Sequence, residues 1–324
     1  MLFALSLHPT IRYRRRVDGN LALIAAIRRE VAAADGRITF ARFMELALYH
    51  PHHGYYATDK HRIGKAGDFF TSVSVGPLFG RILARQFRDW GIDEVTEFGG
   101  HRGQLRADIL AAAPNLKYRI IETGEPVPET LAGCVFSNEF LDALPVHRLH
   151  GDQEVYVDQD FREVLGPLSD PRLPRLPAGY RSEINLRALD WLTDLAHRLQ
   201  PGAFILTIDY GFERAEYFAP HHADGHLQCY HQHTKNTDPY RFVGQQDITA
   251  HVDFTAVMEH GQQLGLKPIL FTNQAYYLAK MGEAEIAAIV TRDAGKLSTE
   301  RNTIHQLLHS TMGTMFRVLI QRKQ

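Results

Sequence analysis

The chain has 324 residues, of which 44% are apolar and 23% are charged, a composition typical of globular proteins. Its 36 Lys and Arg residues nearly balance 37 Asp and Glu residues, so no overall electric field directs the protein to nucleic acid or to an acidic membrane. The apolar runs are too short to cross a bilayer, and two cysteines do not make a disulfide framework. These features exclude extracellular, collagen-like and disordered classes and predict a soluble intracellular protein.

The first residues bear on the compartment. The apolar segment Met1–Leu7 precedes an arginine-rich stretch, whereas a secretory signal peptide has its basic residues first. We therefore expect a cytoplasmic protein. An arginine-rich, acid-poor start is also typical of a mitochondrial transit peptide, so a mitochondrial location is the alternative.

Residues 1–90 are predicted to form a helical region that contains one long loop. Apolar residues recur at helical spacing in three segments, which end near glycine or proline. The predicted helices are Leu21–Ala34, Phe40–Tyr49 and Pro77–Trp90.

From residue 91 onward, short apolar strands alternate with helices, which predicts an α/β fold with a parallel sheet. The predicted strands are Glu94–Phe98, Tyr118–Glu122, Cys134–Ser137 and Phe204–Asp209, with Lys267–Thr272 and Met315–Ile320 added late in the chain. The predicted helices are Gln104–Ala113 and Arg181–Leu199. We expect residues 91–324 to form one core domain, with insertions near residues 146–180 and 212–250.

A glycine turn follows the first predicted strand, at the sheet edge where α/β proteins bind ligands. Glu97, Gly99 and Gly103 lie in this turn, and glycines there let backbone amides approach a ligand closely. Glu122 ends the next predicted strand, 19 residues after Gly103, where a carboxylate accepts hydrogen bonds from a ribose. The turn alone could be structural, but together with Glu122 it favours a nucleoside ligand.

The charge of Glu97 narrows the choice of nucleoside. A carboxylate at the start of the turn would repel the pyrophosphate of NAD, and no phosphate-binding lysine of the Walker type is present. The same carboxylate suits a cationic amino group. S-adenosylmethionine (SAM) has that group and a ribose, so the residues favour SAM over NAD.

Several segments occur in an order that is similar to the MidA family of SAM-dependent methyltransferases. They are ITFARFMELALYHPHHGYY (residues 38–56), GDFFTS (67–72), PLFG (77–80), SNEFLDALPV (137–146), IDYG (208–211) and DITAHVDF (247–254). The resemblance implies a class I methyltransferase core with a Rossmann-like sheet, an N-terminal helical region and inserted substrate elements. The family includes a mitochondrial complex I assembly factor that methylates a protein arginine.

The resemblance also implies which residues bind SAM, and it places the GDFFTS loop over the cofactor. The expected cofactor-binding residues are Glu97, Gly99, Gly103, Glu122, Asn138, Gly67, Asp68, Phe69 and Thr71.

Two departures from the family pattern bear on activity. His101 stands where the family's glycine motif has its middle glycine, and a side chain there is strained if the φ angle is positive. In addition, only 15 residues separate Glu122 from Asn138, too few for the usual helices and strand. The third sheet strand and the wall beside the adenine are therefore expected to be missing. These departures support an alternative function, a catalytically weakened relative that acts as a protein-binding assembly factor.

Two pairs of residues are candidates for catalysis. Glu139 and Asp142 follow the central strand and could hold a planar guanidinium with their carboxylates, although such residues also cap helices. His251 and Asp253 could take up the proton released by methyl transfer, although a buried structural histidine is the competing interpretation.

The favoured function is therefore SAM-dependent methylation of a protein arginine, with a protein substrate or assembly partner. Five histidines between His221 and His233, beside Cys229, raise the question of zinc, but their spacing matches no compact ligand pattern and we assign no metal. Neither nucleic acid nor a membrane is expected as a partner, and the oligomeric state is left open.

Overall fold

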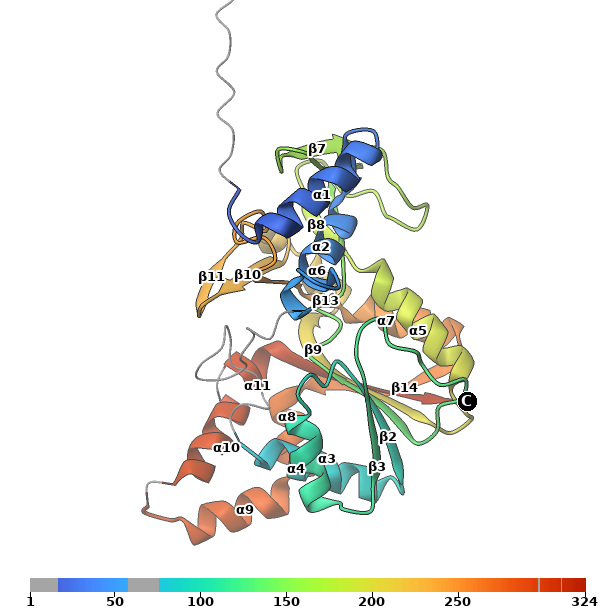
Figure 1. Cartoon of the computed structure of the whole chain (residues 1–324). Coiled ribbons are helices and arrows are strands. Elements are labelled where there is room, and N and C mark those ends of the chain that lie inside the picture. The colour runs from blue at the N-terminus through green and yellow to red at the C-terminus, as the bar shows by residue number, and fades with distance from the viewer. Residues whose placement is uncertain (1–16, 58–75, 297, 310) are drawn as a thin grey trace, which may run out of the picture.

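The computed structural model describes residues 17–57, 76–296, 298–309 and 311–324 (Figure 1). Its large sheet has the strand order β14-β15-β9-β4-β2-β3, and a short strand, β13, pairs with β9. The four strands β3, β2, β4 and β9 are parallel, while β15 is inserted antiparallel between β9 and β14. The strands are β2 (Glu94–Phe98), β3 (Lys117–Ile121), β4 (Cys134–Asn138), β9 (Phe204–Phe212), β13 (Val252–Asp253), β14 (Leu266–Asn273) and β15 (Phe316–Lys323).

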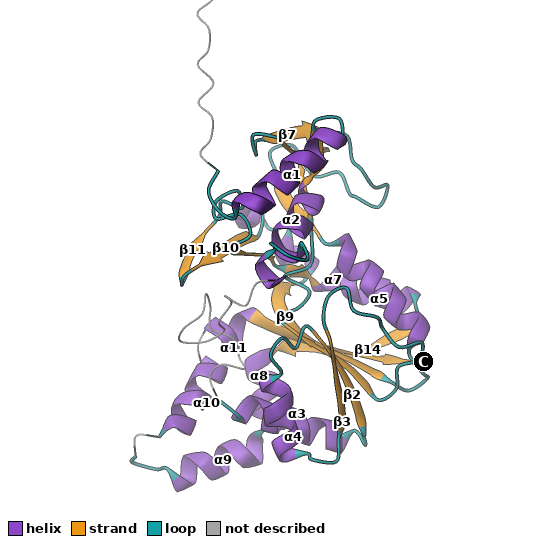
Figure 2. Ribbon diagram, in the orientation of Figure 1, coloured by secondary structure: helices purple, strands orange, loops and turns teal. Residues whose placement is uncertain are grey.

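Helices cover both faces of this sheet, as Figure 2 shows. Side chains alternate along each strand, so that Val135 of β4 joins the core on one face and Phe136 joins the core on the other. The Phe136 face is covered mainly by α3 (Leu78–Asp89), α4 (Gln104–Ala112), α8 (Gln274–Met281) and α10 (Thr299–His309). The Val135 face is covered by α5 (Leu186–Arg198) and α7 (Phe254–Gln263). The expected α/β class, with late strands that close the sheet, is confirmed.

The sheet ends at β3, because no strand forms between β3 and β4. All of residues 122–133 are described, and they contain turns and bends without a helix or strand. Two prolines and two glycines in residues 123–133 disfavour regular structure there. The expected loss of the third sheet strand is therefore confirmed, and β3 is an edge strand.

A second group of elements packs around its own core above the carboxyl ends of the parallel strands (Figure 1). It contains α1 (Leu21–Ala33), β1 (Arg37–Thr39), α2 (Phe40–Tyr49) and two small sheets, whose strands other than β1 lie in the two predicted insertions or, for β8, directly after the first. One sheet is β1-β6-β5-β8 with β7 beside β6, and the other is β11-β10-β12. Their strands are β5 (His147–His150), β6 (Gln153–Asp158), β7 (Glu163–Gly166), β8 (Arg181–Ile184), β10 (Leu227–His231), β11 (Thr234–Asn236) and β12 (Asp247–Ala250).

Residues 1–90 do not all join this upper group. Helices α1 and α2 pack on the insertions, whereas α3 packs against the large sheet. Strand β1 was not predicted, and it forms because Arg37–Thr39 pairs with β6.

The predicted helix over Arg181–Leu199 is wrong at its start. Residues 181–184 form β8, which pairs with β5, and the helix begins only at Leu186. The Asn185 side chain accepts a hydrogen bond from the Ala188 N–H at 2.9 Å and so caps the helix.

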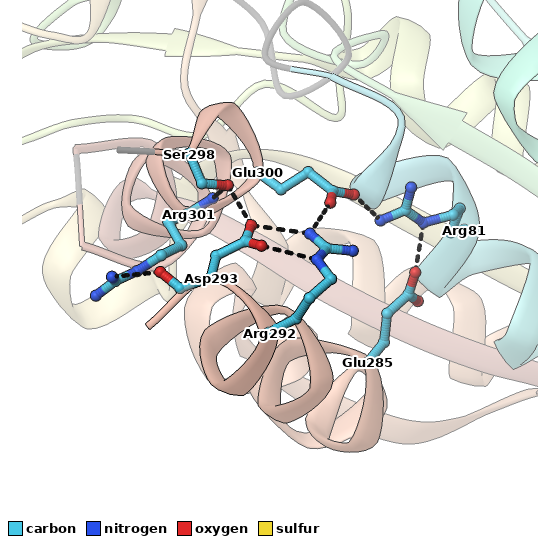
Figure 3. Close-up of polar contacts among 7 residues, drawn as sticks. All are labelled: Arg81, Glu285, Arg292, Asp293, Ser298, Glu300 and Arg301. Carbon is cyan, nitrogen blue, oxygen red and sulfur yellow. Dashed lines mark hydrogen bonds and ion pairs between the residues drawn. The ribbon is translucent and has the colours of Figure 1, made fainter. Parts of the chain in front are cut away.

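Ion pairs join α3 to the C-terminal helices α9 (Glu283–Arg292) and α10 (Figure 3). Arg81 of α3 pairs with Glu285 and, at 2.7 Å, with Glu300, and Arg292 pairs with Asp293 and Glu300. Glu300 therefore bridges two arginines from different helices. Among the described residues, no helix combines the length and the apolar character that crossing a membrane requires.

Candidate functional site

The turn after β2 has the backbone that a glycine motif provides. Gly99 and Gly103 have φ angles of +72° and +70°, and Gly103 precedes the first residue of α4. His101 lies between them with a φ of +48°, so its backbone has the left-handed conformation that glycine favours. A Cβ atom on Gly100 would lie 2.6 Å from the Glu97 carboxylate, so a larger residue there would have to displace the Glu97 side chain. The expected strain at His101 is confirmed.

Glu97 is buried beneath this turn, with 3% of its surface exposed. The Tyr118 hydroxyl donates a hydrogen bond to it at 3.0 Å. Burial nevertheless raises the pKa of Glu97 to about 7, because desolvation penalises the charged form more than this hydrogen bond favours it. A cation bound beside the turn would favour the ionised carboxylate.

Glu122 follows β3 and lies against the same turn. The backbone N–H of His101 donates to its carboxylate, and burial raises its pKa. Its Oε1 atom is buried without a hydrogen-bond partner among the described residues, and so is Oδ1 of Asn138 at the end of β4. Buried polar atoms of this kind normally have partners. These two oxygens are hydrogen-bond acceptors beside a glycine turn, and the hydroxyl groups of the ribose and the amino group of SAM could donate to them.

The turn after β4 packs directly on the glycine turn, since a Cβ atom on Gly99 would lie 2.8 Å from the Phe140 ring. Glu139 begins this second turn with a φ of +53°. Asp209, which follows the apolar residues of β9, holds this turn in place. Its carboxylate accepts hydrogen bonds from the N–H groups of Phe140 and Leu141 at 3.1 and 2.8 Å. Glu139 thus has a fixed, strained backbone beside the cofactor turn.

Further buried carboxylates surround Glu139. Burial raises the pKa of Asp209 to about 7, although backbone donors oppose the shift. The pKa of Asp142 lies well above its ordinary value, because the group is buried and because Asp209, Glu139 and Asp247 add negative charge nearby. Four acidic side chains therefore share one small region at the carboxyl ends of β4 and β9.

Elements of the upper group close this region. The Tyr56 hydroxyl donates to Asp247 at 2.9 Å, and its ring stacks on Tyr49 at 5.3 Å. The Ala250 N–H of β12 donates to the backbone oxygen of Asp142 at 2.9 Å. Acidic groups bordered by aromatic rings can bind a planar cation.

Asp209 and Asp247 were not selected as site residues from the sequence. Both lie in segments on which the family resemblance rests, IDYG and DITAHVDF. The sequence signal for Asp209 is its position directly after the apolar run FILTI. The carboxyl ends of parallel strands meet at one sheet edge, so an acid at the end of a strand is a candidate site residue.

The structure separates the expected pair His251 and Asp253. The Asp253 side chain caps α7, accepting from the Ala256 N–H at 3.0 Å, and pairs with Arg214 at 3.3 Å. His251 instead contacts His226, with their Nδ1 atoms 3.2 Å apart. Burial and the neighbouring histidines lower the pKa of His251 to about 3, which makes it a weak proton acceptor. The structure therefore does not form the His–Asp pair, because Asp253 is engaged by the helix.

Four expected cofactor residues, Gly67, Asp68, Phe69 and Thr71, lie outside the described residues. In the histidine-rich insertion, possible metal-binding atoms of Glu216, His221 and His222 lie within 4.8 Å of one another. His221 Nε2 and Glu216 are hydrogen-bonded at 2.8 Å and both side chains are exposed, so hydrogen bonding already accounts for this arrangement. It carries no metal assignment.

Comparisons with solved structures agree with this fold. A protein from Burkholderia thailandensis, crystallised with S-adenosyl-homocysteine, is 30% identical to this chain. The match covers 93% of this chain and 92% of that protein, with a TM-score of 0.83. A second structure from the same organism is 29% identical to this chain, with a TM-score of 0.80.

Curated relatives cover most of the chain at lower identity. The rat protein arginine methyltransferase NDUFAF7, mitochondrial, is 25% identical, over 83% of this chain and 76% of its own length. Its Drosophila melanogaster homologue is 26% identical, over 93% and 85%. These names fit the mitochondrial alternative and give no support to a cytoplasmic location, while the bacterial structures show that similar proteins are not confined to mitochondria.

The family model described as "Putative S-adenosyl-L-methionine-dependent methyltransferase" matches residues 124–272, which include β4, β9 and both insertions. Together with the 30% identity over nearly all of a solved relative, this match confirms the expected family and its cofactor, SAM. The chain belongs to the MidA family of SAM-dependent methyltransferases.

Proposed function

We propose that this chain transfers a methyl group from SAM to a guanidinium nitrogen of an arginine in a protein substrate. The observation that carries the proposal is the group of acidic side chains beside the cofactor turn: Glu139, Asp142, Asp209 and Asp247. An arginine side chain is the planar cation that paired carboxylates hold most specifically.

When bound, SAM supplies a methyl group on a positively charged sulfur. The chain's own residues would orient the guanidinium so that one nitrogen lies in line with that methyl group. As the N–C bond forms and the S–C bond breaks, the nitrogen must release a proton. Asp142, whose pKa lies above its ordinary value, is suited to take up that proton, while Asp209 holds the turn through its backbone donors.

The relatives support the arginine substrate. The rat and Drosophila proteins are named protein arginine methyltransferases, and they align with 83% and 93% of this chain. The same names support a protein rather than a small molecule as the partner.

The alternative function is a protein-binding assembly factor without catalysis, which His101 and the missing third strand favour. Against it, the site keeps an unpartnered Glu122 oxygen and a complete acidic region. The relative that holds S-adenosyl-homocysteine aligns with 93% of this chain. We therefore favour the enzyme.

The test is to titrate the protein with S-adenosyl-homocysteine by calorimetry and to incubate it with methyl-labelled SAM and arginine-containing proteins. We expect binding and label on arginine. Binding without label on any protein would contradict catalysis and favour the assembly factor. The absence of binding, in protein shown by circular dichroism to be folded, would contradict both the cofactor and the enzyme.

Glu139→Gln separates the acceptor side of the site from the cofactor side. If Glu139 holds the guanidinium, the variant lowers kcat/KM for the protein substrate about tenfold or more, the effect of losing one charge-assisted hydrogen bond. The dissociation constant of S-adenosyl-homocysteine stays within about twofold. The matched control is Glu129→Gln, which removes the same charge from an exposed glutamate. Equal losses of activity and cofactor affinity would instead place Glu139 at the cofactor.

A further inference from the structure

A buried histidine and a half-buried histidine face each other at the paired ends of β10 and β12. The Nδ1 atoms of His226 and His251 are 3.2 Å apart, within hydrogen-bonding distance. His226 precedes β10 and is 3% exposed, while His251 follows β12 and is half-buried. A hydrogen bond between two imidazoles requires that one nitrogen carries the proton and the other accepts it.

The backbone decides which nitrogen carries the proton. His226 Nε2 lies 2.8 Å from the carbonyl oxygen of Tyr217, and a carbonyl oxygen can only accept. His226 Nε2 must therefore be protonated. Burial lowers the pKa of His226, which favours the neutral ring, so its Nδ1 has a free lone pair. It follows that Nδ1 of His251 is the donor.

The opposite nitrogen of His251 is then an acceptor. No hydrogen bond involves His251 Nε2 among the described residues. The ring stacks near Tyr210 with centroids 6.3 Å apart. Burial raises the pKa of Tyr210, and the negative charges of Glu139 and Asp142 raise it further. The preceding residue, Ala250, is hydrogen-bonded to Asp142. Tyr210 and Ala250 therefore connect the His251 segment to the acidic region.

His226 is itself held in place. Its backbone N–H donates to Glu183 at 2.6 Å, and its ring packs on the Tyr217 ring with centroids 4.0 Å apart. The Tyr217 hydroxyl donates to the backbone oxygen of Glu183 at 2.7 Å. A buried ring with both nitrogens engaged has one orientation, and it can impose that orientation on a neighbour.

We propose that His226 is a positioning residue that fixes His251 as the Nδ1–H tautomer, so that His251 Nε2 accepts a hydrogen bond from an N–H of the substrate guanidinium. This inference rests on the proposed function for the identity of the substrate. The tautomer itself does not depend on the substrate. In this proposal His251 orients the substrate guanidinium and does not take up its proton, which was its expected role.

Two substitutions of His226 distinguish its nitrogens. In His226→Gln, the amide lies at the position of Nε2 and can still donate to Tyr217, but no nitrogen or oxygen lies at the position of Nδ1. In His226→Asn, the amide lies at the position of Nδ1, where its oxygen can accept from His251. The first variant removes the interaction and the second restores it. His231→Gln is the control, because His231 pairs with the backbone oxygen of Gln245 and is outside this pair.

The experiment records long-range ¹H–¹⁵N NMR correlations of the full chain labelled in its histidine rings, with His251 assigned from the spectrum of His251→Asn. In the wild type and His226→Asn, we expect a protonated Nδ1 and an unprotonated Nε2. In His226→Gln, we expect that pattern to be lost and kcat to fall about tenfold or more. Affinity for S-adenosyl-homocysteine should stay within about twofold.

Each result decides the inference. A protonated Nε2 on His251 in the wild type, or an unchanged tautomer in His226→Gln, would overturn it. The inference would also be overturned if His226→Asn lost the His251 tautomer as fully as His226→Gln does. That result would mean that the tautomer requires the imidazole ring of His226 and not merely an acceptor at the position of Nδ1. If the wild type methylates no arginine, the proposed function fails, while the NMR spectra still test the tautomer.

Discussion

At the scale of single residues, the proposed cofactor side of the site contains buried polar atoms that have no hydrogen-bond partner among the described residues. Oε1 of Glu122 is buried and unbonded among the described residues, and a ribose hydroxyl would satisfy it. We expect Glu122→Ala to weaken binding of S-adenosyl-homocysteine by about 2 kcal/mol, the contribution of hydrogen bonds to a charged group. Calorimetric titration measures this, with Glu129→Ala as the exposed control. Unchanged affinity would show that Glu122 does not bind the ribose.

His101 tests whether backbone strain limits cofactor affinity. Its φ of +48° is one that glycine adopts without strain, so His101→Gly should tighten SAM binding by about 1 kcal/mol. Asp35→Gly is a matched control, because Asp35 has a φ of +52° at the end of α1, outside the site. Asp35→Gly should change the free energy of unfolding and leave SAM affinity unchanged. If His101→Gly binds SAM no more tightly than the wild type, the missing strand rather than the turn limits affinity.

At the scale of elements, ion pairs hold the C-terminal helices against α3. Arg81 is partly shielded and contacts two carboxylates from α9 and α10, whereas Arg85 on the same helix has one exposed partner, Asp89, at 3.6 Å. Networks contribute more than isolated exposed pairs. We expect Arg81→Gln to lower the free energy of unfolding by about 1 kcal/mol, and Arg85→Gln by less.

Urea denaturation at low and high salt checks this expectation. The difference between the two variants should shrink at about 1 M salt, where the Debye length is about 3 Å. Equal effects of the two substitutions at low salt would mean that the network in Figure 3 adds nothing beyond isolated pairs.

At the scale of the whole molecule, buried acids couple stability to pH. The folded-state pKa of Glu97 is about 7, compared with an ordinary value of 4.5. Between these pH values the unfolded chain loses a proton that the folded chain keeps, so the contribution of Glu97 to stability falls as pH rises from about 4.5 to 7. Glutamine mimics the protonated form. Glu97→Gln should therefore gain up to about 3 kcal/mol relative to the wild type across this range.

The measurement is urea denaturation of both proteins at several pH values. Comparing the two proteins removes the opposite contribution of His226 and His251, whose pKa values are lowered by folding. A constant difference between the proteins would show that Glu97 has an ordinary pKa in the folded state.

The sequence by itself determined the order of strands and helices in the core and the chemistry of the cofactor side. The strand at residues 94–98 and the helix at residues 40–49 have the predicted bounds, because hydrophobic periodicity and capping residues are local signals. The short interval after Glu122 likewise predicted the missing strand, because 15 residues that include two prolines and two glycines are too few for a further strand and its connecting helices. The family followed from motifs distributed over most of the chain.

Only the tertiary structure decided which side chains meet. It joined Asp209 and Asp247 to Glu139 and Asp142, because strands distant in sequence end at the same sheet edge. It paired His251 with His226 rather than with Asp253, because a helix N-terminus engages the Asp253 carboxylate. It also divided residues 1–90 between two cores. These contacts depend on packing between segments that no local pattern connects, so sequence periodicity could not reveal them.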